Sequence, residues 1–315
     1  MRLTVRVPAT IANLGPGFDC LGMAVGLHNE VTLAEEDEFS LEVSGEGANE
    51  LPRNRSNLIP TSMEHFARAA GRELPSFSLH CTNRIPLERG LGSSSSAVVA
   101  GVTLADRLLG TSLEPDRLLG VAVEVEGHAD NVAPALRGGL VLAYRSRTGW
   151  RAEQVPLSPE LMPVVLVPRA ARMPTLEARR VLPGGVTRED AVFNAARAAL
   201  LVMALGGRTQ LLAEALEDRL HQDVRLSLVP EARRIFDMLR EAGVPVCVAG
   251  SGPSLLAFER EGMRLPEPDS DWEVLRLRLD LSGAKITSEL CQPRLGAMSE
   301  SASILRRADQ EGPST

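Results

Sequence analysis

The most informative segment of the chain is Ile85-Pro-Leu-Glu-Arg-Gly-Leu-Gly-Ser-Ser-Ser-Ser-Ala97. Its two glycines let the backbone approach a ligand closely, and the apolar residues behind the serines predict a helix over 93–109. The first N–H groups of a helix lack partners and carry partial positive charge, so they bind anions, most often phosphate. Serine hydroxyls can bind phosphate oxygens or Mg²⁺. The composition also fits a flexible loop, but four serines before a long apolar helix favour a phosphate loop.

Two further polar segments are candidates for binding. The first, Pro8–Asp19 (PATIANLGPGFD), follows an alternating strand and offers the side chains of Asn13 and Asp19. Both side chains are also typical of turns, where they cap backbone groups. The second, 249–254 (AGSGPS), lies between two expected strands and predicts a tight turn. Neither segment alone distinguishes a ligand site from a structural turn.

A fourth segment, Glu124–Pro134 (EVEGHADNVAP), lies at the end of an expected helix. Within six residues it exposes Glu126, His128, Asp130 and Asn131. Carboxylate oxygens suit Mg²⁺, so Glu126 is a candidate metal ligand. His128 lacks partners at the spacing of a transition-metal site, which favours a hydrogen-bonded structural role for it.

Composition excludes several function classes. Of the 315 residues, 44% are hydrophobic and 24% charged, as in a globular protein. The net charge of −7 argues against a nucleic-acid partner, and no apolar run of about 18 residues predicts a membrane span. The start of the chain has no apolar signal-peptide core. Four separated cysteines without a Cys-x-x-Cys pair indicate reduced thiols, which is typical of a cytoplasmic protein.

The pattern of apolar residues predicts an α+β fold in two domains. In the first half we expect strands at 2–8, 22–34, 39–45, 76–83 and 139–145, and helices at 57–71, 93–109 and 114–126. In the second half we expect strands at 162–168, 244–249, 254–259 and 272–281, and helices at 175–181, 188–205, 208–220 and 230–242. A boundary at 146–160 divides the chain into domains 1–155 and 156–290, followed by a polar tail, 291–315.

Together these four segments resemble the small-molecule kinase family that includes galactokinases, homoserine kinases, mevalonate kinases and phosphomevalonate kinases. The segment Pro86–Ser94 is similar to that family's phosphate loop, and the likeness runs from about residue 4 to about residue 287. The segments Ala12–Gly22 and His128–Pro134 look like signatures of the homoserine kinase branch. The resemblance implies a ribosomal-protein-S5-like N-terminal domain, a ferredoxin-like C-terminal domain, and an active site between them. It also implies ATP-dependent phosphorylation of the L-homoserine hydroxyl, in threonine biosynthesis, with Mg²⁺.

The resemblance assigns roles to individual residues. The nucleotide site would comprise Asn57, Pro86, Leu87, Glu88, Arg89, Gly90, Leu91, Gly92, Ser93, Ser94, Ser95 and Ser96. Mg²⁺ would be held by Ser94 and Glu126. The amino-acid substrate would be bound by Asn13, Asp19, Asn131, Arg179 and Arg225, and catalysis would involve Asn131, Thr175 and Arg179. Asp223-Val224 replaces the usual Pro-Tyr before Arg225, which weakens that one assignment.

Several alternatives stay open at this point. The one lysine of the sequence is Lys285, so the N-terminal catalytic lysine of some relatives has no counterpart. We favour a reaction without a dedicated base, with Asn131 at the place of the relatives' aspartate and Asp130 as the alternative base. The substrate could instead be another alcohol, such as mevalonate, or the protein could be a binder that senses nucleotide or amino acid. Relatives are often dimers, so the resemblance admits a homodimer.

Overall fold

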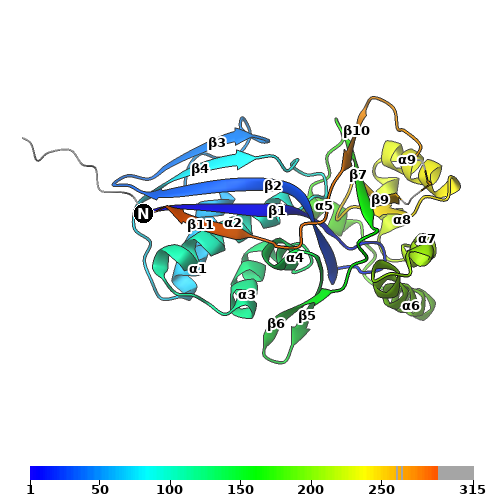
Figure 1. Cartoon of the computed structure of the whole chain (residues 1–315), viewed down its shortest axis with the longest axis horizontal. Helices are drawn as coiled ribbons and strands as arrows, with labels where there is room; N and C mark the ends of the chain where they lie inside the picture. Colours follow the sequence, from blue (N-terminus) through cyan, green and yellow to red (C-terminus); the bar gives the residue numbers. More distant parts are fainter. Residues whose placement is uncertain (260–261, 264, 290–315) are drawn as a thin grey trace, which may run out of the picture.

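The structure is a computed structural model and describes residues 1–259, 262–263 and 265–289. It contains one seven-stranded and one four-stranded sheet, each with its own helices (Figure 1). The larger sheet comprises β1 (Arg2–Ala12), β2 (Leu21–Glu35), β3 (Ser40–Gly45), β4 (Phe77–Asn83), β5 (Leu140–Ser146), β6 (Gly149–Val155) and β11 (Lys285–Glu289). Its helices are α1 (Leu58–Ala69), α2 (Ser93–Leu109), α3 (Pro115–Glu126) and α4 (Val132–Arg137). The predicted α+β class is confirmed.

The larger sheet presents one face to its four helices (Figure 1). The strand order is β11-β1-β2-β4-β3, and β5 pairs with both β2 and β6. The pair β3 and β4 is parallel, with α1 in the connection between them, whereas the other pairs are antiparallel. Alternation in β1 directs Leu3, Val5 and Val7 to the core, where all three are buried.

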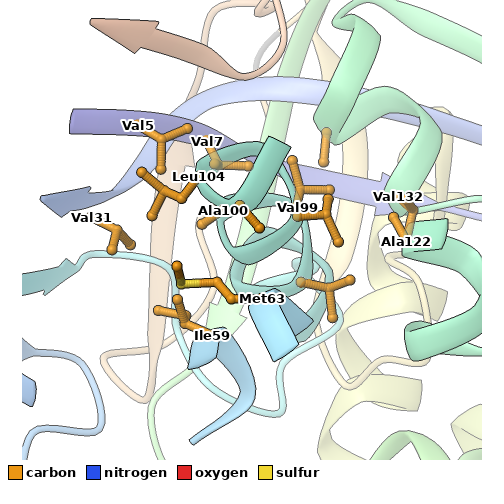
Figure 2. Packing of buried hydrophobic residues seen from close by; sticks show 14 of the residues in the cluster. Val5, Val7, Val31, Ile59, Met63, Val99, Ala100, Leu104, Ala122 and Val132 are labelled. Atoms are coloured by element: carbon orange, nitrogen blue, oxygen red, sulfur yellow. The ribbon is translucent and has the colours of Figure 1, made fainter. Parts of the chain in front are cut away.

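Helix α2 is the centre of this domain. Val99, Ala100 and Leu104 of α2 are buried against the sheet and the neighbouring helices (Figure 2). A Cβ at Gly101 would lie 2.6 Å from the carbonyl oxygen of Ile59, so α1 and α2 approach each other closely at this point. A helix packed on several sides cannot shift without opening the core. The segment at its N-terminus, the expected phosphate loop, therefore has a rigid base.

The smaller sheet comprises β7 (Met162–Pro168), β8 (Val246–Val248), β9 (Leu255–Glu259) and β10 (Trp272–Arg276). Its order is β10-β7-β9-β8 with all pairs antiparallel, which is the order of a ferredoxin-like sheet. The accompanying helices are α5 (Thr175–Arg180), α6 (Arg188–Leu205), a 3₁₀ turn (Thr209–Leu211), α7 (Leu212–Ala215), α8 (Gln222–Ser227) and α9 (Pro230–Glu241). The apolar face of α9 is buried at Ala232, Ile235, Phe236 and Leu239, which is helical spacing.

The end of the chain differs from the prediction. The expected strand at 272–281 stops at Arg276, and the chain then crosses back to form β11 beside β1, with Lys285 opposite Arg6. The crossing segment is held by bonds such as Asp280 N–H to the carbonyl of Ala24. The alternating pattern continues through 281 but cannot show which sheet supplies the partner. Residues 285–289, predicted within the domain 156–290, therefore belong to the N-terminal sheet.

Several short elements were not predicted, namely α4, α8 and β6. Strand β6 lies within the expected boundary 146–160, where Gly149 begins the strand rather than a linker. The helix expected at 208–220 is broken after Ala215, because the side chain of Asp218 accepts from the backbone N–H groups that begin α8. The expected polar tail, 291–315, lies outside the described residues. Among the helices that the structure describes, none has the length and apolar character needed to cross a bilayer.

Candidate active site

Two cavities meet at the loop that precedes α2. The smaller, of about 110 Å³, is lined by polar side chains from both domains, among them Asp130, Asn131, Arg179 and Arg225. The larger, of about 440 Å³, lies between α1, β4 and the loop and is lined mainly by apolar groups. Glu88, Ser93 and Ser94 line both cavities. A ligand that spans them would therefore pass directly over the N-terminus of α2.

Two glycines of the loop, Gly90 and Gly92, make close contacts with the rest of the protein. Gly90 and Gly92 both have left-handed φ angles, of 71° and 70°. A Cβ at Gly90 would lie 2.0 Å from the carbonyl oxygen of Ala249, and one at Gly92 would lie 2.1 Å from Thr10 Oγ1. The glycines thus let the loop pack against the strand β1 and the turn after β8. Gly90 thereby admits the backbone of Ala249 and Gly92 admits the side chain of Thr10, a packing role that the sequence did not predict; both glycines also line the smaller cavity.

We expect Gly92→Ala to lower the free energy of unfolding by at least about 2 kcal/mol, because it adds left-handed strain to the contact with Thr10. Gly120→Ala is the matched control, since Gly120 is within α3 and its Cβ would meet nothing within 4 Å. That substitution should stabilise the protein by about 0.5–1 kcal/mol. Urea unfolding of both variants measures the difference, and equal stability of the two would refute the packing role.

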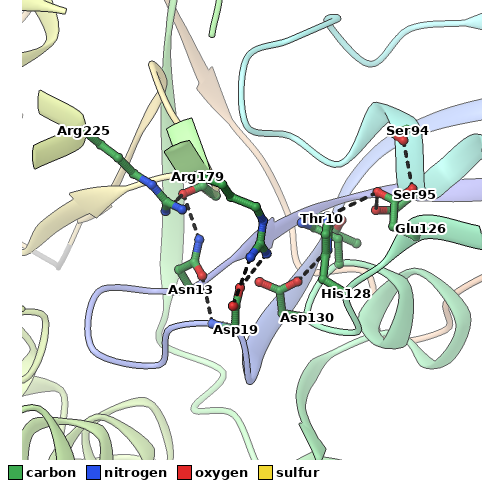
Figure 3. A network of polar contacts seen from close by, with 12 residues as sticks. Thr10, Asn13, Asp19, Ser94, Ser95, Glu126, His128, Asp130, Arg179 and Arg225 are labelled. Carbon is green, nitrogen blue, oxygen red and sulfur yellow. Dashed lines mark hydrogen bonds and ion pairs between the residues drawn. The ribbon is translucent and has the colours of Figure 1, made fainter. Parts of the chain in front are cut away.

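The carboxylate of Glu126 lies beside the first turn of α2 (Figure 3). Ser94 Oγ donates to its Oε2 at 2.9 Å, and Ser95 Oγ donates to its Oε1 at 2.6 Å. The predicted pair of Ser94 and Glu126 is therefore brought together, and Ser95 joins it. Ser96 points elsewhere, because its hydroxyl donates to the carbonyl of Ser93 and accepts from Asn29.

The oxygen atoms at this point suit a hard divalent cation. Ser94 and Glu126 supply hydroxyl and carboxylate oxygens, the donor types that Mg²⁺ prefers. In the described part of the chain, no group of three or more His, Cys, Asp or Glu side chains could hold a metal ion by itself. Mg²⁺ commonly keeps few protein ligands and completes its shell with phosphate oxygens and water. The site therefore fits a cation that arrives with a phosphate ligand.

Asn131 and His128 are fixed by neighbours. Thr10 Oγ1 donates to Asn131 Oδ1 at 2.8 Å, which leaves the Asn131 amide nitrogen for the small cavity. His128 Nδ1 lies 2.9 Å from Asp130 Oδ1, and its Nε2 lies 3.6 Å from Glu126 Oε1. Burial lowers the pKa of His128, but Asp130 and Glu126 together outweigh it and leave that pKa raised. The expected hydrogen-bonded role of His128 is confirmed.

Asp19 and Arg179 form an ion pair across the domain boundary (Figure 3). The contact is bidentate, with Nη2 to Oδ1 at 2.6 Å and Nη1 to Oδ2 at 3.1 Å. Burial lowers the pKa of Arg179, and the hydrogen bond and charge of Asp19 reverse that effect and raise it. Both side chains are predicted to bind the amino-acid substrate; in the structure they bind each other.

Arg225 is a buried cation with uncharged partners. Its Nη1 donates to the carbonyl of Gly250 at 2.8 Å and to His221 Nδ1 at 3.0 Å. Among the described residues its Nε has no hydrogen-bond partner, and no carboxylate forms an ion pair with it. Burial lowers the pKa of Arg225 to about 10. The charges of Asp19, Asp130 and Asp218 act on Arg225 only from beyond ion-pair distance, and a buried charge without an ion-pair partner is costly, so this position suits an anionic ligand.

Two family models match the chain, that of the GHMP kinases N terminal domain over residues 57–139 and that of the GHMP kinases C terminal over 196–262. The homoserine kinase of Clavibacter michiganensis is 42% identical over 297 residues, covering 90% of this chain and 94% of the relative. The chain belongs to the homoserine kinase family. The homoserine kinase of Desulfitobacterium hafniense is 43% identical over 256 residues, covering 81% of this chain and 86% of the relative.

A solved structure agrees with this family assignment. The crystal structure of homoserine kinase from Cytophaga hutchinsonii has a TM-score of 0.77 and 28% identity, and covers 91% of this chain and 97% of that one. The predicted kinase family and its two-domain architecture are thereby confirmed.

Within this homoserine kinase family fold, the remaining predicted nucleotide residues divide into two groups. Asn57 and Leu87 line the larger cavity, and the other loop residues up to Ser95 line the smaller one. The amide of Asn57 caps α1, accepting from Ile59 N–H and donating to the carbonyl of Pro52. The guanidinium of Arg89 is bound to the backbone of the other domain, since its Nε and Nη2 donate to the carbonyls of Pro168 and Arg169.

Asn13 is also held by the backbone. Its Oδ1 accepts from Asp19 N–H at 3.0 Å, and its Nδ2 donates to the carbonyl of Gly250 at 2.9 Å. Asn13 and Leu14 both have left-handed φ angles, of 70° and 49°, so the chain turns here, and Asp19 pairs with Arg179. Both readings of Asn13, as a turn residue and as a member of the site, therefore apply.

Sequence reasoning missed Thr10, His221 and the contact of Ser95 with Glu126. Thr10 reaches a partner 121 residues away, and His221 contacts the carbonyl of Gly15 across 206 residues. No periodicity or spacing signals such contacts. A usable signal existed only for Ser95, because it follows Ser94 in the first turn of a predicted helix.

We expect His221 to make stability depend on pH. Burial lowers its pKa to about 4, from an ordinary value of 6.5. Between these values the unfolded chain binds a proton and the folded chain does not, so acidification favours unfolding. The contribution of neutral His221 to the free energy of unfolding is fully present above pH 6.5. As pH falls to about 4, on the order of 3 kcal/mol of this contribution should be lost. Urea unfolding of wild type and His221→Asn across this range measures the difference; parallel curves would contradict it.

Proposed function

We propose that this chain transfers the γ-phosphoryl group of ATP to the side-chain hydroxyl of L-homoserine, giving O-phospho-L-homoserine and ADP in threonine biosynthesis. The observation that carries the proposal is the buried guanidinium of Arg225, which lies beside the phosphate loop and has no ion-pair partner among the described residues. A carboxylate would neutralise it, which favours an amino acid over a sugar. The names of the relatives support this substrate.

The nucleotide would lie across both cavities. The apolar cavity near Asn57 suits the adenosine group, and the phosphates would meet the N–H groups that begin α2. Ser94 and Glu126 would hold Mg²⁺, which neutralises charge on the β- and γ-phosphates when it is bound. The backbone of residues 88–92 would surround the phosphates, because Glu88 and both glycines line the small cavity.

The amino acid would lie in the smaller cavity. Its carboxylate would bind Arg179 and Arg225, which line the cavity, and its ammonium group would bind Asp19, which is paired with Arg179. This requires the Asp19–Arg179 pair to open or to be shared. The side chains of Arg179 and Asp19 are 35% and 39% exposed, so the pair contributes only about 1 kcal/mol and opens easily. When the zwitterion binds, its ammonium group takes the place of Arg179 beside Asp19, and its carboxylate takes the place of Asp19 beside Arg179.

The chemistry would depend on position and charge. Phosphoryl transfer proceeds through a loose transition state, so a strong base is not required. The hydroxyl oxygen forms the new bond to phosphorus, the bond to ADP breaks, and the proton leaves to solvent or to a phosphate oxygen. Asn131, Thr175 and Arg179 line the cavity and would orient the hydroxyl and the transferring group. Lys285 lines neither cavity, since it lies on β11.

We expect Asp130→Asn to retain activity within about 10-fold of wild type, because an amide oxygen can still accept from His128. The measurement is kcat with saturating ATP and L-homoserine, with fold checked by circular dichroism. A general base contributes about 10²–10⁴-fold. A loss of that size with intact substrate binding would make Asp130 the base and contradict the base-free reaction.

Two other functions, a kinase for another alcohol and a nucleotide sensor, predict different results in one activity assay. We would measure ADP release with Mg²⁺ and, separately, L-homoserine, mevalonate, L-serine, L-threonine and galactose. Selective release with L-homoserine supports the proposal. Release with another alcohol would keep the phosphate loop and overturn the roles of Asp19, Arg179 and Arg225. Binding of ATP without turnover on any alcohol would favour a sensor.

We also propose a cytoplasmic location, and the resemblance admits a homodimer without nucleic-acid or membrane partners. The thiols of Cys20, Cys81 and Cys247 are free, as expected in a reducing compartment. Burial raises the pKa of Cys81 to about 12 and that of Cys20 to about 11, so neither is a reactive thiolate at neutral pH.

A further inference from the structure

We propose that His221 is a positioning residue that holds the guanidinium of Arg225 ready for the substrate carboxylate, with Phe18 supporting both side chains. The inference rests on the proposed function, because it concerns how one end of L-homoserine is recognised. It gives a role to a buried histidine that the phosphoryl transfer itself does not use.

The hydrogen-bond partners of His221 leave its neutral ring a single tautomer. Its Nε2 lies 2.8 Å from the carbonyl oxygen of Gly15, so Nε2 carries a proton and donates. Its Nδ1 therefore accepts, and it faces Arg225 Nη1 at 3.0 Å. The ring stacks on Phe18 with a centroid distance of 5.1 Å, and Arg225 Cζ lies 5.5 Å from the same Phe18 ring. Phe18 thus packs against both His221 and Arg225.

The charge state of His221 matters as much as its position. Burial lowers the pKa of His221 to about 4; the carboxylate of Asp218, 3.8 Å from Nε2, opposes this shift, and the charge of Arg225 adds to it. The imidazole is therefore neutral at physiological pH, and it orients the guanidinium without neutralising it. An acidic residue in its place would pair with Arg225 and compete with the substrate carboxylate. A neutral acceptor leaves the positive charge available.

The backbone that carries His221 is anchored independently. The fully buried carboxylate of Asp218 accepts from the N–H groups of His221 and Gln222, and from the side chain of Asn194. Gln222 in turn accepts from Val248 N–H and donates to the carbonyl of Leu216. Asp218 thus fixes the backbone of His221 itself, which lets His221 act as a rigid reference for Arg225, whereas Gln222 ties the rest of α8 to the smaller sheet.

The experiment compares two acceptors that differ only in the carboxylate, L-homoserine and 3-aminopropan-1-ol. The ratio of their kcat/KM values measures how well the site uses the carboxylate, and it does not depend on how much enzyme is folded. The variants are His221→Phe, which keeps the stack on Phe18 but removes the acceptor, and His221→Asn, whose Oδ1 can take the place of Nδ1. Gln222→Leu is the matched control, a buried neighbour that does not contact Arg225.

We expect the wild-type ratio to exceed about 10², the selectivity of a site with a buried charged contact. In His221→Phe the ratio should fall at least about 10-fold, through a higher KM for L-homoserine with KM for ATP unchanged. His221→Asn should retain the ratio within about 3-fold. Gln222→Leu should lower the melting temperature and leave the ratio unchanged. If His221→Phe does not fold, Phe18→Leu should give the same reduction in the ratio.

Two results separate the inference from the proposed function. An unchanged ratio in His221→Phe, or in Phe18→Leu where that variant is used, would overturn the positioning role while leaving homoserine as the substrate. An equal reduction in Gln222→Leu would also overturn it, because the effect would then follow any disturbance of α8. A wild-type ratio near one would instead contradict the placement of the carboxylate at Arg225, and with it the proposed mode of substrate binding.

Discussion

Replacing Glu126 with glutamine should lower kcat by about 10³-fold while the protein stays folded. The amide keeps the shape of the side chain; its oxygen can accept from one of the two serines, and its NH2 group can donate to the hydroxyl oxygen of the other. It removes the negative charge that suits a divalent cation at the start of α2. Because charge neutralisation matters most in the transition state, kcat should fall much more than the affinity for ATP.

Glu124→Gln is the matched control for this variant. Glu124 lies on the same helix, 64% exposed, and its carboxylate is 3.1 Å from His65 on the surface. Steady-state kinetics of Glu124→Gln should match the wild type within about 2-fold, as is usual for a surface pair. A Glu126→Gln variant with kcat above about one tenth of wild type would show that this carboxylate does not hold the catalytic cation.

Replacing Arg225 with methionine should lower kcat/KM for L-homoserine by about 10²–10³-fold. The variant loses the charge that would bind the substrate carboxylate. The same change should leave the free energy of unfolding unchanged or raise it, because Arg225 is a buried cation without an ion-pair partner in the described structure. Opposite effects on activity and stability are the mark of a side chain retained for function.

The comparison for this second variant is Arg233→Met. Arg233 lies on α9 and pairs with Asp223 at 2.9 Å on the surface, outside both cavities. Its removal should change neither kcat/KM nor stability by more than the experimental scatter. If Arg225→Met were destabilised by several kcal/mol, the guanidinium would be part of the structural framework rather than an unneutralised binding group.

The sequence is most informative where local patterns determine structure. The loop before α2 is predicted from glycines, serines and an apolar helix in one continuous segment. The resemblance of this segment to a kinase family is confirmed. Helix α3 spans Pro115–Glu126, which agrees with the helix expected at 114–126. The pairing of Ser94 with Glu126 was also expected, although only through the family resemblance.

The structure adds what depends on contacts between distant segments. The alternation through Leu281 gave no means of predicting that the chain leaves the smaller sheet after Arg276 and adds β11 to the larger one. The Asp19–Arg179 pair joins side chains 160 residues apart. His221 and Arg225 are only four residues apart, but the burial of this pair depends on how α8 packs in the domain, which the local sequence does not show.

The most direct test of the account is an internal competition under limiting ATP. The purified protein, Mg²⁺ and one molar equivalent each of L-homoserine, L-serine, L-threonine, mevalonate and galactose would share half an equivalent of ATP. Mass spectrometry would then identify every phosphorylated product. The site described here predicts O-phospho-L-homoserine as nearly all of the product. Phosphomevalonate, galactose phosphate or an even mixture would contradict selection of the substrate by Asp19, Arg179 and Arg225.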